Sequence, residues 1–352
     1  MADLEAKKSV DQMSRSGEEP PPEYIVKDSK FGSIETSPPL GPFPVVDLTV
    51  FSHSSSSSSS QDLEQELAKL RSSLSSAGGC FQAIGHGISN SLLDKIREVS
   101  IDFFSLPVEE KHKYARAVNE AEGYGSDMIV SDKQVHDWSH RLSLRVFPQH
   151  KRRLNLWPQI PQDFRETLDE YAMKIKIVTE VLFKEIAKSL NLEENSFLNQ
   201  FGEQSLMQTR FNFYPPCSRP DLVHGVKPHT DRSGITILLQ DKEVEGLQIV
   251  VDGKWYRVPV IPYALVVNLG DQMQIMSNGI YKSPMHRVVT NTEKLRISVA
   301  SFIEPDPFNE IGPVEHLIDE QRPRLYRNVK NYGIINYECY QKGLVALETV
   351  QV

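Results

Sequence analysis

Apolar residues recur at helical spacing through much of the first half of the chain. In residues 62–76, leucines three or four positions apart lie on one face of a helix: Leu63, Leu67, Leu70 and Leu74. Residues 163–190 continue the same spacing over a longer stretch and predict a long amphipathic helix. Ser89 or Asn90 begins a further predicted helix that ends near Phe104, and residues 108–114 predict a short one.

The second half, from about Met207, changes to short apolar segments separated by Gly, Pro and Asn. These segments have the length of strands: 235–239, 247–251, 264–269 and 296–303. Similar segments precede them at 43–48, 80–84 and 142–147. Many short strands at such intervals are typical of a sandwich or barrel. The pattern predicts a mixed α+β fold, in which a jelly roll of two facing sheets forms the core and helices surround it.

Composition divides the chain into four parts of one integrated unit. Residues 1–42 are polar and proline-rich, and we expect a flexible, loosely attached arm. Residues 43–200 are expected to form a helical and β region that packs on the core. Residues 201–310 are expected to form the jelly-roll core with the site, and residues 311–352 a C-terminal helical segment. The serine run at 54–60 predicts a surface loop.

Charge and cysteine content narrow the class of protein. The 352 residues carry a formal net charge of -8, which does not favour binding to nucleic acid. The three cysteines lie far apart and form neither a disulfide framework nor a metal motif. The N-terminus does not resemble a secretory leader, and no apolar run is long enough to span a bilayer. We therefore expect a monomeric, cytoplasmic protein that acts on a small molecule away from membranes.

His229 and Asp231 carry the first chemical signal. Two positions apart on a strand, both side chains point to the same face, where one metal ion can bind both. His286 begins another predicted strand and supplies a third ligand. Two imidazoles and one carboxylate form the facial triad of non-haem Fe(II) oxygenases, and they also occur in catalytic zinc sites. An isolated His-x-Asp is common by chance, and His86, which has no partner at ligand spacing, is predicted to be structural.

Arg296 and Ser298 follow the second histidine and share one face of a predicted strand. A guanidinium and a hydroxyl suit the remote carboxylate of a small dicarboxylic acid. An octahedral Fe(II) site has room for such a co-substrate, whereas a zinc hydrolase has no need of it. Arg210, Asn212 and Tyr214 alternate with apolar residues and share one face of a third predicted strand. These polar side chains either lie near the metal or belong to an ordinary amphipathic strand and face solvent.

These motifs together resemble the plant 2-oxoglutarate- and Fe(II)-dependent dioxygenases of specialised metabolism. The resemblance covers about residues 43–340 and rests on these segments: 212–217, 229–231, 246–248, 267–271, 277–283, 286–288 and 296–298. It implies a double-stranded β-helix, which is a jelly roll. It also implies that Fe(II) is bound by His229, Asp231 and His286. Because Asp231 is present, the resemblance does not extend to the halogenases of this chemistry, which lack the carboxylate.

The resemblance also implies the co-substrates and the reaction. Arg296 and Ser298 would bind the tail of 2-oxoglutarate with help from Tyr214, and Asn212 would lie near its metal-binding end. O2 is the second co-substrate and ascorbate the expected reductant. Decarboxylation of 2-oxoglutarate to succinate is then coupled to oxidation of a substrate C–H bond, and the outcome is hydroxylation, O-demethylation or desaturation.

Positions that contact substrate in flavonol and anthocyanidin synthases differ here. The chain keeps Phe302 and Glu304, but it has Arg141 and Ser143 in place of two aromatic residues and Arg210 in place of a lysine. The loss of two aromatic walls weakens stacking on a flat flavonoid. We therefore expect an alkaloid, terpenoid or phenylpropanoid substrate, as in codeine O-demethylase-like enzymes. Arg141 and Arg210 either bind an anionic or phenolic group or face solvent.

Three alternatives stay open. Within the class, the alternative is a flavonoid oxidase. Outside it, the chain would be a non-catalytic jelly-roll binding module or a zinc hydrolase. The intact triad and the Arg296–Ser298 pair disfavour both of these, because neither function requires all five residues.

Overall fold

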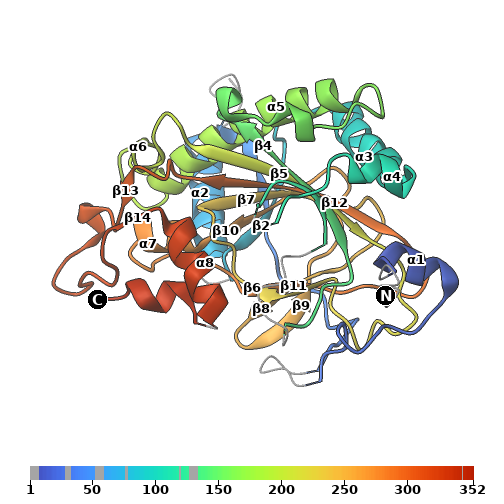
Figure 1. The fold of residues 1–352 in the computed structure, drawn as a ribbon. Coiled ribbons are helices and arrows are strands. Elements are labelled where there is room, and N and C mark those ends of the chain that lie inside the picture. Colours follow the sequence, from blue (N-terminus) through green and yellow to red (C-terminus); the bar gives the residue numbers. More distant parts are fainter. Residues whose placement is uncertain are drawn as a thin grey trace.

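The computed structural model describes residues 8–27, 33–51, 59–75, 78–118, 120–126, 134–342 and 344–352. Most of the serine run predicted to be a loop, 54–58, lies outside the described residues. A larger and a smaller sheet lie in separate layers, and helices cover the outer side of the larger sheet (Figure 1). This arrangement confirms the predicted mixed α+β jelly roll.

The larger sheet has eight strands, and its neighbours pair antiparallel except for the parallel pair β1 and β2. Its spatial order is β1 (Val45–Asp47), β2 (Cys80–Ile84), β10 (Leu265–Leu269), β7 (Ile235–Leu239), β12 (Arg296–Glu304), β5 (Leu206–Tyr214), β4 (His140–Phe147) and β3 (Gly123–Gly125). The smaller sheet has the order β6 (Val226–His229), β11 (His286–Val288), β8 (Leu247–Val251) and β9 (Lys254–Arg257). A separate pair joins β13 (Glu310–Ile311) and β14 (Val329–Lys330).

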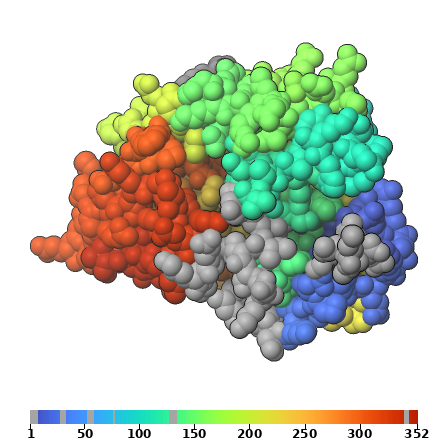
Figure 2. Space-filling model, in the orientation of Figure 1, coloured from blue at the N-terminus to red at the C-terminus, as the bar shows by residue number. Residues whose placement is uncertain are grey.

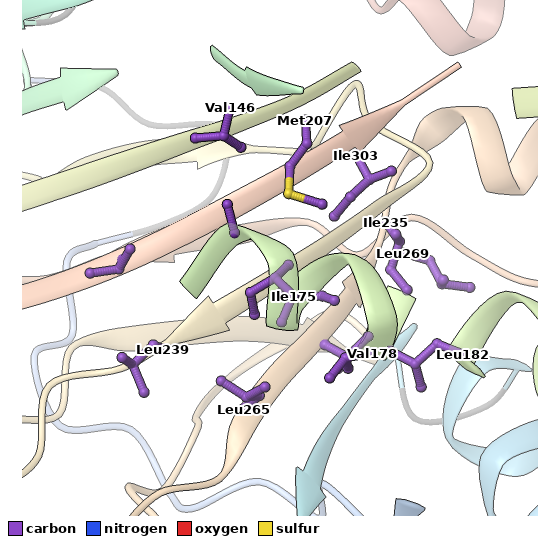
Figure 3. Close-up of a cluster of buried hydrophobic side chains, with 14 of the residues drawn as sticks. Val146, Ile175, Val178, Leu182, Met207, Ile235, Leu239, Leu265, Leu269 and Ile303 are labelled. Carbon is purple, nitrogen blue, oxygen red and sulfur yellow. The ribbon is translucent and has the colours of Figure 1, made fainter. Parts of the chain in front are cut away.

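Helices of the first half pack on the larger sheet, close to where the sequence predicts them. They are α2 (Ser60–Ser75), α3 (Asn90–Ser105), α4 (Val108–His112) and α5 (Phe164–Lys188). The short helix α6 (Leu198–Phe201), which the sequence does not predict, packs against α5 and β13. Ser89 is the N-cap of α3, because its hydroxyl accepts a hydrogen bond from the Leu92 amide. Figure 3 shows the apolar contact between α5 and the strands, with Ile175, Val178 and Leu182 of the helix facing the sheet.

Strand β12 shows how alternation divides the protein into two apolar cores. The helix-side core contains Ile297, Val299 and Ile303. The core between the two sheets contains Ala300 together with residues of the smaller sheet such as Ile249. Side chains two positions apart share a face of a strand, so Arg296 and Ser298 also point between the sheets. The fold thus directs the predicted polar residues into the jelly roll.

The N-terminal residues differ from the predicted loose arm. Helix α1 (Val10–Ser16) begins with a capping box, in which Ser9 and Gln12 each bond the other's backbone amide. Val10 and Met13 are 1% and 3% exposed and pack in one cluster with Trp138. The prediction is wrong for this segment because two apolar residues three positions apart give the helix a buried face.

Residues 33–41 also lie against the core. They cross the smaller sheet, where Gln248 Nε2 donates to the Glu35 carbonyl over 2.9 Å and Arg257 Nε donates to the Pro38 carbonyl over 2.7 Å. Such bonds satisfy donors on the outer side of the sheet, and proline content alone does not reveal them.

The C-terminal segment gathers on one side of the molecule, as its orange and red colour shows in Figure 2. It contains α8 (Tyr332–Lys342) and follows α7 (Asp271–Met276) of the core. Short 3₁₀ turns complete the description: Leu48–Phe51, Gln149–Lys151, Leu154–Leu156, Glu315–Leu317 and Ala346–Val350. His86 is structural as predicted, since its Nε2 lies 2.8 Å from the Tyr263 carbonyl. Within the described part of the chain, no helix is both long and apolar enough to cross a membrane.

Candidate active site

His229, Asp231 and His286 come together at the end of the smaller sheet. His229 ends β6 and His286 begins β11, and the antiparallel pairing places them directly opposite each other. Asp231 Oδ1 lies 3.6 Å from His229 Nε2 and 3.7 Å from His286 Nε2. The three ligand atoms lie within 4.8 Å of one another. Their chemistry, two imidazoles and one carboxylate, fits a single divalent metal ion.

Hydrogen bonds orient all three side chains. His229 Nδ1 donates to the Lys227 carbonyl over 2.8 Å, and His286 Nδ1 donates to the Pro284 carbonyl over 3.0 Å. Because a carbonyl can only accept, each Nδ1 carries a proton, and in the neutral ring Nε2 then keeps its lone pair for a metal.

A hydroxyl holds the carboxylate in the same way. Thr236 Oγ1 donates to Asp231 Oδ2 over 2.6 Å, which leaves Oδ1 on the side of the two imidazoles. The sequence pattern does not reveal the role of Thr236, because its contact depends on how β7 lies beside the segment that follows β6.

Electrostatics favour the metal-binding protonation states of His229 and Asp231. Desolvation of the ring and the neighbouring His286 lower the pKa of His229. Burial raises the pKa of Asp231, but the two imidazoles and the Thr236 hydroxyl outweigh it, so the pKa is lowered overall. Neutral imidazoles and an ionised carboxylate are the forms that ligate a metal ion.

A buried arginine lies beside the triad. Arg296 is 2% exposed, and its Nε donates to the Val244 carbonyl over 3.2 Å. Among the described residues neither Nη atom has a hydrogen-bond partner. A buried charged group needs partners for its donors, so these two atoms indicate a site for an anionic ligand.

The strand neighbours of Arg296 complete this part of the site. In the β12–β5 register Arg296 pairs with Tyr214 and Ser298 pairs with Asn212. Asn212 Nδ2 donates to Ser298 Oγ over 3.3 Å, and the Arg296 guanidinium lies 5.1 Å from the centre of the Tyr214 ring. Burial raises the pKa of Tyr214, which remains a neutral hydroxyl.

One cavity joins the two groups of residues. Its lining includes the triad together with Arg296, Ser298, Asn212, Tyr214, Arg210 and Phe302. Apolar side chains from both sheets complete its walls: Val226, Leu238, Leu247, Val288 and Ala300. The structure therefore brings together the predicted metal ligands and the predicted co-substrate residues.

Of the five predicted substrate contacts, two line the cavity, two lie on the neighbouring strand β4, and one lies outside the cavity. Arg210 and Phe302 line the cavity, and the Arg210 guanidinium lies 4.7 Å from the centre of the Phe302 ring. Arg141 and Ser143 lie on β4 opposite Asn212 and Arg210, so they share that face one strand further from the triad.

Glu304 is not part of this cavity. It forms an ion pair with Arg232 at 3.1 Å, at the far end of β12. Residue type and alternation place Glu304 on the inner face of the strand, but they do not reveal the arginine that pairs with it.

A jelly roll with two histidines, a carboxylate and a buried arginine in one cavity defines a class of non-haem iron oxygenase. Comparison with known proteins supports the same class. Residues 204–305 match the 2OG-Fe(II) oxygenase superfamily, and residues 43–160 match the family described as non-haem dioxygenase in morphine synthesis N-terminal.

Individual relatives cover most of the chain. Codeine O-demethylase of Papaver somniferum is 40% identical over 277 residues, which is 79% of this chain and 77% of the relative. Flavonol synthase/flavanone 3-hydroxylase of Eustoma exaltatum subsp. russellianum is 41% identical over 270 residues, 76% of this chain and 80% of the relative. The crystal structure of JOX2 in complex with 2OG, Fe and JA has a TM-score of 0.86 at 32% identity, covering 99% of this chain and 98% of that one.

The chain belongs to the 2OG-Fe(II) oxygenase superfamily. It is an oxidoreductase that depends on Fe(II) and 2-oxoglutarate. This conclusion excludes the non-catalytic binding module and the zinc hydrolase.

Proposed function

We propose that this oxygenase hydroxylates or O-demethylates a small plant specialised metabolite, with release of succinate and CO2. Its relatives support this reading, because they include codeine O-demethylase of Papaver somniferum and flavonoid 7-O-demethylase 1 of Ocimum basilicum. The single observation that carries the proposal is the buried Arg296, whose two unpaired Nη atoms share a cavity with the triad.

The proposal assigns His229, Asp231 and His286 as the Fe(II) ligands. The donor set fits the metal, since both imidazoles direct Nε2 toward the carboxylate while each Nδ1 is bonded to a backbone carbonyl. Bound Fe(II) and 2-oxoglutarate supply the activation of O2 that oxidises a C–H bond of the substrate. The role of the three side chains is to hold the ion at one end of the cavity, and the role of Thr236 is to hold the carboxylate.

Arg296 and Ser298 are the proposed partners of the remote carboxylate of 2-oxoglutarate. The guanidinium supplies two free donors, and a planar fork matches a carboxylate geometrically. Tyr214 and Asn212 flank the pair on β5 and complete a polar surface around the co-substrate. The apolar walls of the cavity exclude water from the remaining space, which limits side reactions.

Arg210 and Phe302 are the proposed substrate contacts within the cavity. Because the guanidinium of Arg210 lies over the Phe302 ring, one face of this ring is already covered. This contact leaves less of the ring for stacking on a flat flavonoid, so it favours an alkaloid, terpenoid or phenylpropanoid. Arg141 and Ser143 would act from the neighbouring strand, and Glu304 through its pairing with Arg232.

Flavonoid oxidation is the second candidate function. It is favoured by the 41% identity with the flavonol synthase/flavanone 3-hydroxylase of Eustoma exaltatum subsp. russellianum, which is close to the 40% identity with codeine O-demethylase. A comparison of flavonoid and alkaloid substrates therefore belongs in the first set of assays.

The same proposal describes a cytoplasmic monomer that uses ascorbate as reductant. All three cysteines are buried and free, which suits a reducing compartment. Size-exclusion chromatography with light scattering tests the oligomeric state, and omission of ascorbate from the assay tests the reductant.

The experiment that tests the proposal measures succinate release from 2-oxoglutarate with Fe(II), ascorbate and a library of plant metabolites. Mass spectrometry of the products distinguishes the outcomes: gain of an oxygen atom marks hydroxylation, loss of a methylene unit marks demethylation, and loss of a hydrogen pair marks desaturation. Full turnover in His229→Ala would refute the assignment of the iron ligands.

A further inference from the structure

A buried hydrogen bond between Tyr332 and Asp271 lies directly behind the triad. Tyr332 is the first residue of α8, and Asp271 is the first residue of α7. The two side chains belong to residues that are 1% and 2% exposed. Tyr332 Oη donates to Asp271 Oδ2 over 2.9 Å. The C-terminal helix is thus joined to the core through a carboxyl group that is shielded from solvent.

The backbone of Asp271 continues this connection to the metal site. Its amide N–H donates to the Asp231 carbonyl over 2.8 Å. Asp231 supplies the carboxylate of the triad. A continuous path therefore runs from Tyr332 through Asp271 to the main chain of Asp231, by way of two hydrogen bonds.

Neighbouring contacts hold the same two segments together. Gln272 Nε2 donates to the Arg232 carbonyl over 2.9 Å, and the Gly270 amide donates to the Gly234 carbonyl over 3.0 Å. The residues on the C-terminal side of Asp231 are therefore attached to the start of α7. Any displacement of α7 is transmitted to the backbone that carries the carboxylate.

We propose that Tyr332 is a positioning residue that holds Asp231 for the metal through Asp271, so that the docking of α8 sets the affinity for Fe(II). This inference rests on the proposed function, because it takes Asp231 as an iron ligand. Removal of the Tyr332 hydroxyl takes away the hydrogen bond that Oδ2 of the buried Asp271 carboxyl accepts, and loss of a buried bond weakens the hold of α8 on α7. Partners that orient metal ligands typically account for roughly 10–100-fold in metal affinity.

Tyr326, which precedes α8 in the C-terminal segment, offers a matched control that bonds the same helix, α7. It is 3% exposed, and its Oη accepts a hydrogen bond from Gln274 Nε2 over 2.8 Å. Both tyrosines thus bond a side chain of α7 from the C-terminal segment. Gln274 lies further along α7, and the path through it does not include Asp231. Tyr326→Phe therefore removes a comparable buried bond without touching the proposed connection.

The test is an anaerobic Fe(II) titration of the full-length chain and its variants. We expect Tyr332→Phe to weaken Fe(II) affinity roughly tenfold, and Tyr326→Phe to stay within about twofold of the wild-type chain. Thermal unfolding should show similar losses of stability for both variants, because each loses one buried hydrogen bond. Equal Fe(II) affinities for the two variants would overturn the proposal.

A double-mutant cycle tests whether the two residues act in one path. Tyr332→Phe and Asp271→Ala should weaken Fe(II) binding by similar factors, and the combined variant should lose little more than either alone. Additive losses would contradict a shared path. Asp271→Asn keeps an acceptor for the Tyr332 hydroxyl, so it should bind Fe(II) within about threefold of the wild-type chain. A loss as large as that of Asp271→Ala would also overturn the proposal.

The outcome separates this inference from the proposed function. A wild-type chain that fails to bind Fe(II) or to release succinate refutes the proposed function. A wild-type chain that binds Fe(II) with the same affinity as Tyr332→Phe refutes the role of Tyr332 alone.

Discussion

Replacing Arg296 with methionine separates the co-substrate role of this residue from any structural role. The side chain is 2% exposed, and its Nε bonds the Val244 carbonyl, while both Nη atoms have no hydrogen-bond partner among the described residues. Without a ligand, the guanidinium is a buried charge with unsatisfied donors, which is costly. The ligand that satisfies it should therefore bind tightly, and that ligand should be 2-oxoglutarate.

The size of the effect follows from the two unpaired Nη atoms. A hydrogen bond to a charged group contributes about 1.5–3 kcal/mol, so losing two of them costs about 3–6 kcal/mol. This free energy corresponds to a rise of roughly 100-fold or more in the KM for 2-oxoglutarate. Arg296→Lys keeps the charge but loses the planar fork, and its KM should lie between those of the wild-type chain and Arg296→Met.

The assay is the initial rate of succinate formation as a function of 2-oxoglutarate concentration. Thermal unfolding supplies the control: 2-oxoglutarate should raise the Tm of the wild-type chain and leave that of Arg296→Met unchanged. Without 2-oxoglutarate, the variant should be about as stable as the wild-type chain, because an apolar side chain of similar volume replaces a buried charge. An unchanged KM in Arg296→Met would show that Arg296 does not bind 2-oxoglutarate.

Three further predictions concern the triad, the response to pH and the N-terminus. Thr236→Val removes the 2.6 Å bond to Asp231 and should weaken Fe(II) affinity roughly tenfold in an anaerobic titration, so an unchanged affinity counts against the bond. Burial lowers the pKa of His140 from 6.5 to about 4, so the unfolded chain binds more protons in this window and stability falls as the pH falls. Urea unfolding should show a contribution of about 2 kcal/mol lost between pH 7 and pH 5 that His140→Phe abolishes; an identical pH response in the variant would contradict it. Met13→Ala should lower the free energy of unfolding by about 2 kcal/mol or more, whereas a loosely attached arm predicts no change.

The sequence predicts one part of the site directly: side chains two positions apart on a strand, which share a face. Alternation within one strand holds for Arg296 and Ser298 of β12, whereas β6 ends at His229 and Asp231 lies two residues beyond it, so the prediction that both stand on one strand is wrong. The strand that carries Asn212 follows the same rule, and the β12–β5 register then places it opposite Ser298. These predictions needed only the local backbone conformation.

The sequence does not predict the contacts between side chains of distant segments. The bond from Thr236 to Asp231, the position of Arg210 over Phe302 and the pairing of Arg232 with its carboxylate all depend on the order of strands in the sheets. A single sequence specifies this order only through the packing of the whole protein.

The N-terminal residues show a related limit. Their overall composition is polar, which predicts disorder, but a few apolar residues and backbone carbonyls find partners on the core. The average composition of this segment is polar, so it does not reveal contacts that single apolar residues make with the core.

The most direct measurement of the central claim is succinate formation by single-residue variants under saturating 2-oxoglutarate, Fe(II) and an accepted substrate. Asp231→Ala and His286→Ala remove candidate ligands whose atoms lie 3.7 Å apart, while His316→Ala changes an exposed histidine far along the chain. We expect both ligand variants to lose succinate formation and Fe(II) binding, and His316→Ala to keep both. Succinate formation that survives in either ligand variant would contradict the assignment of the iron ligands.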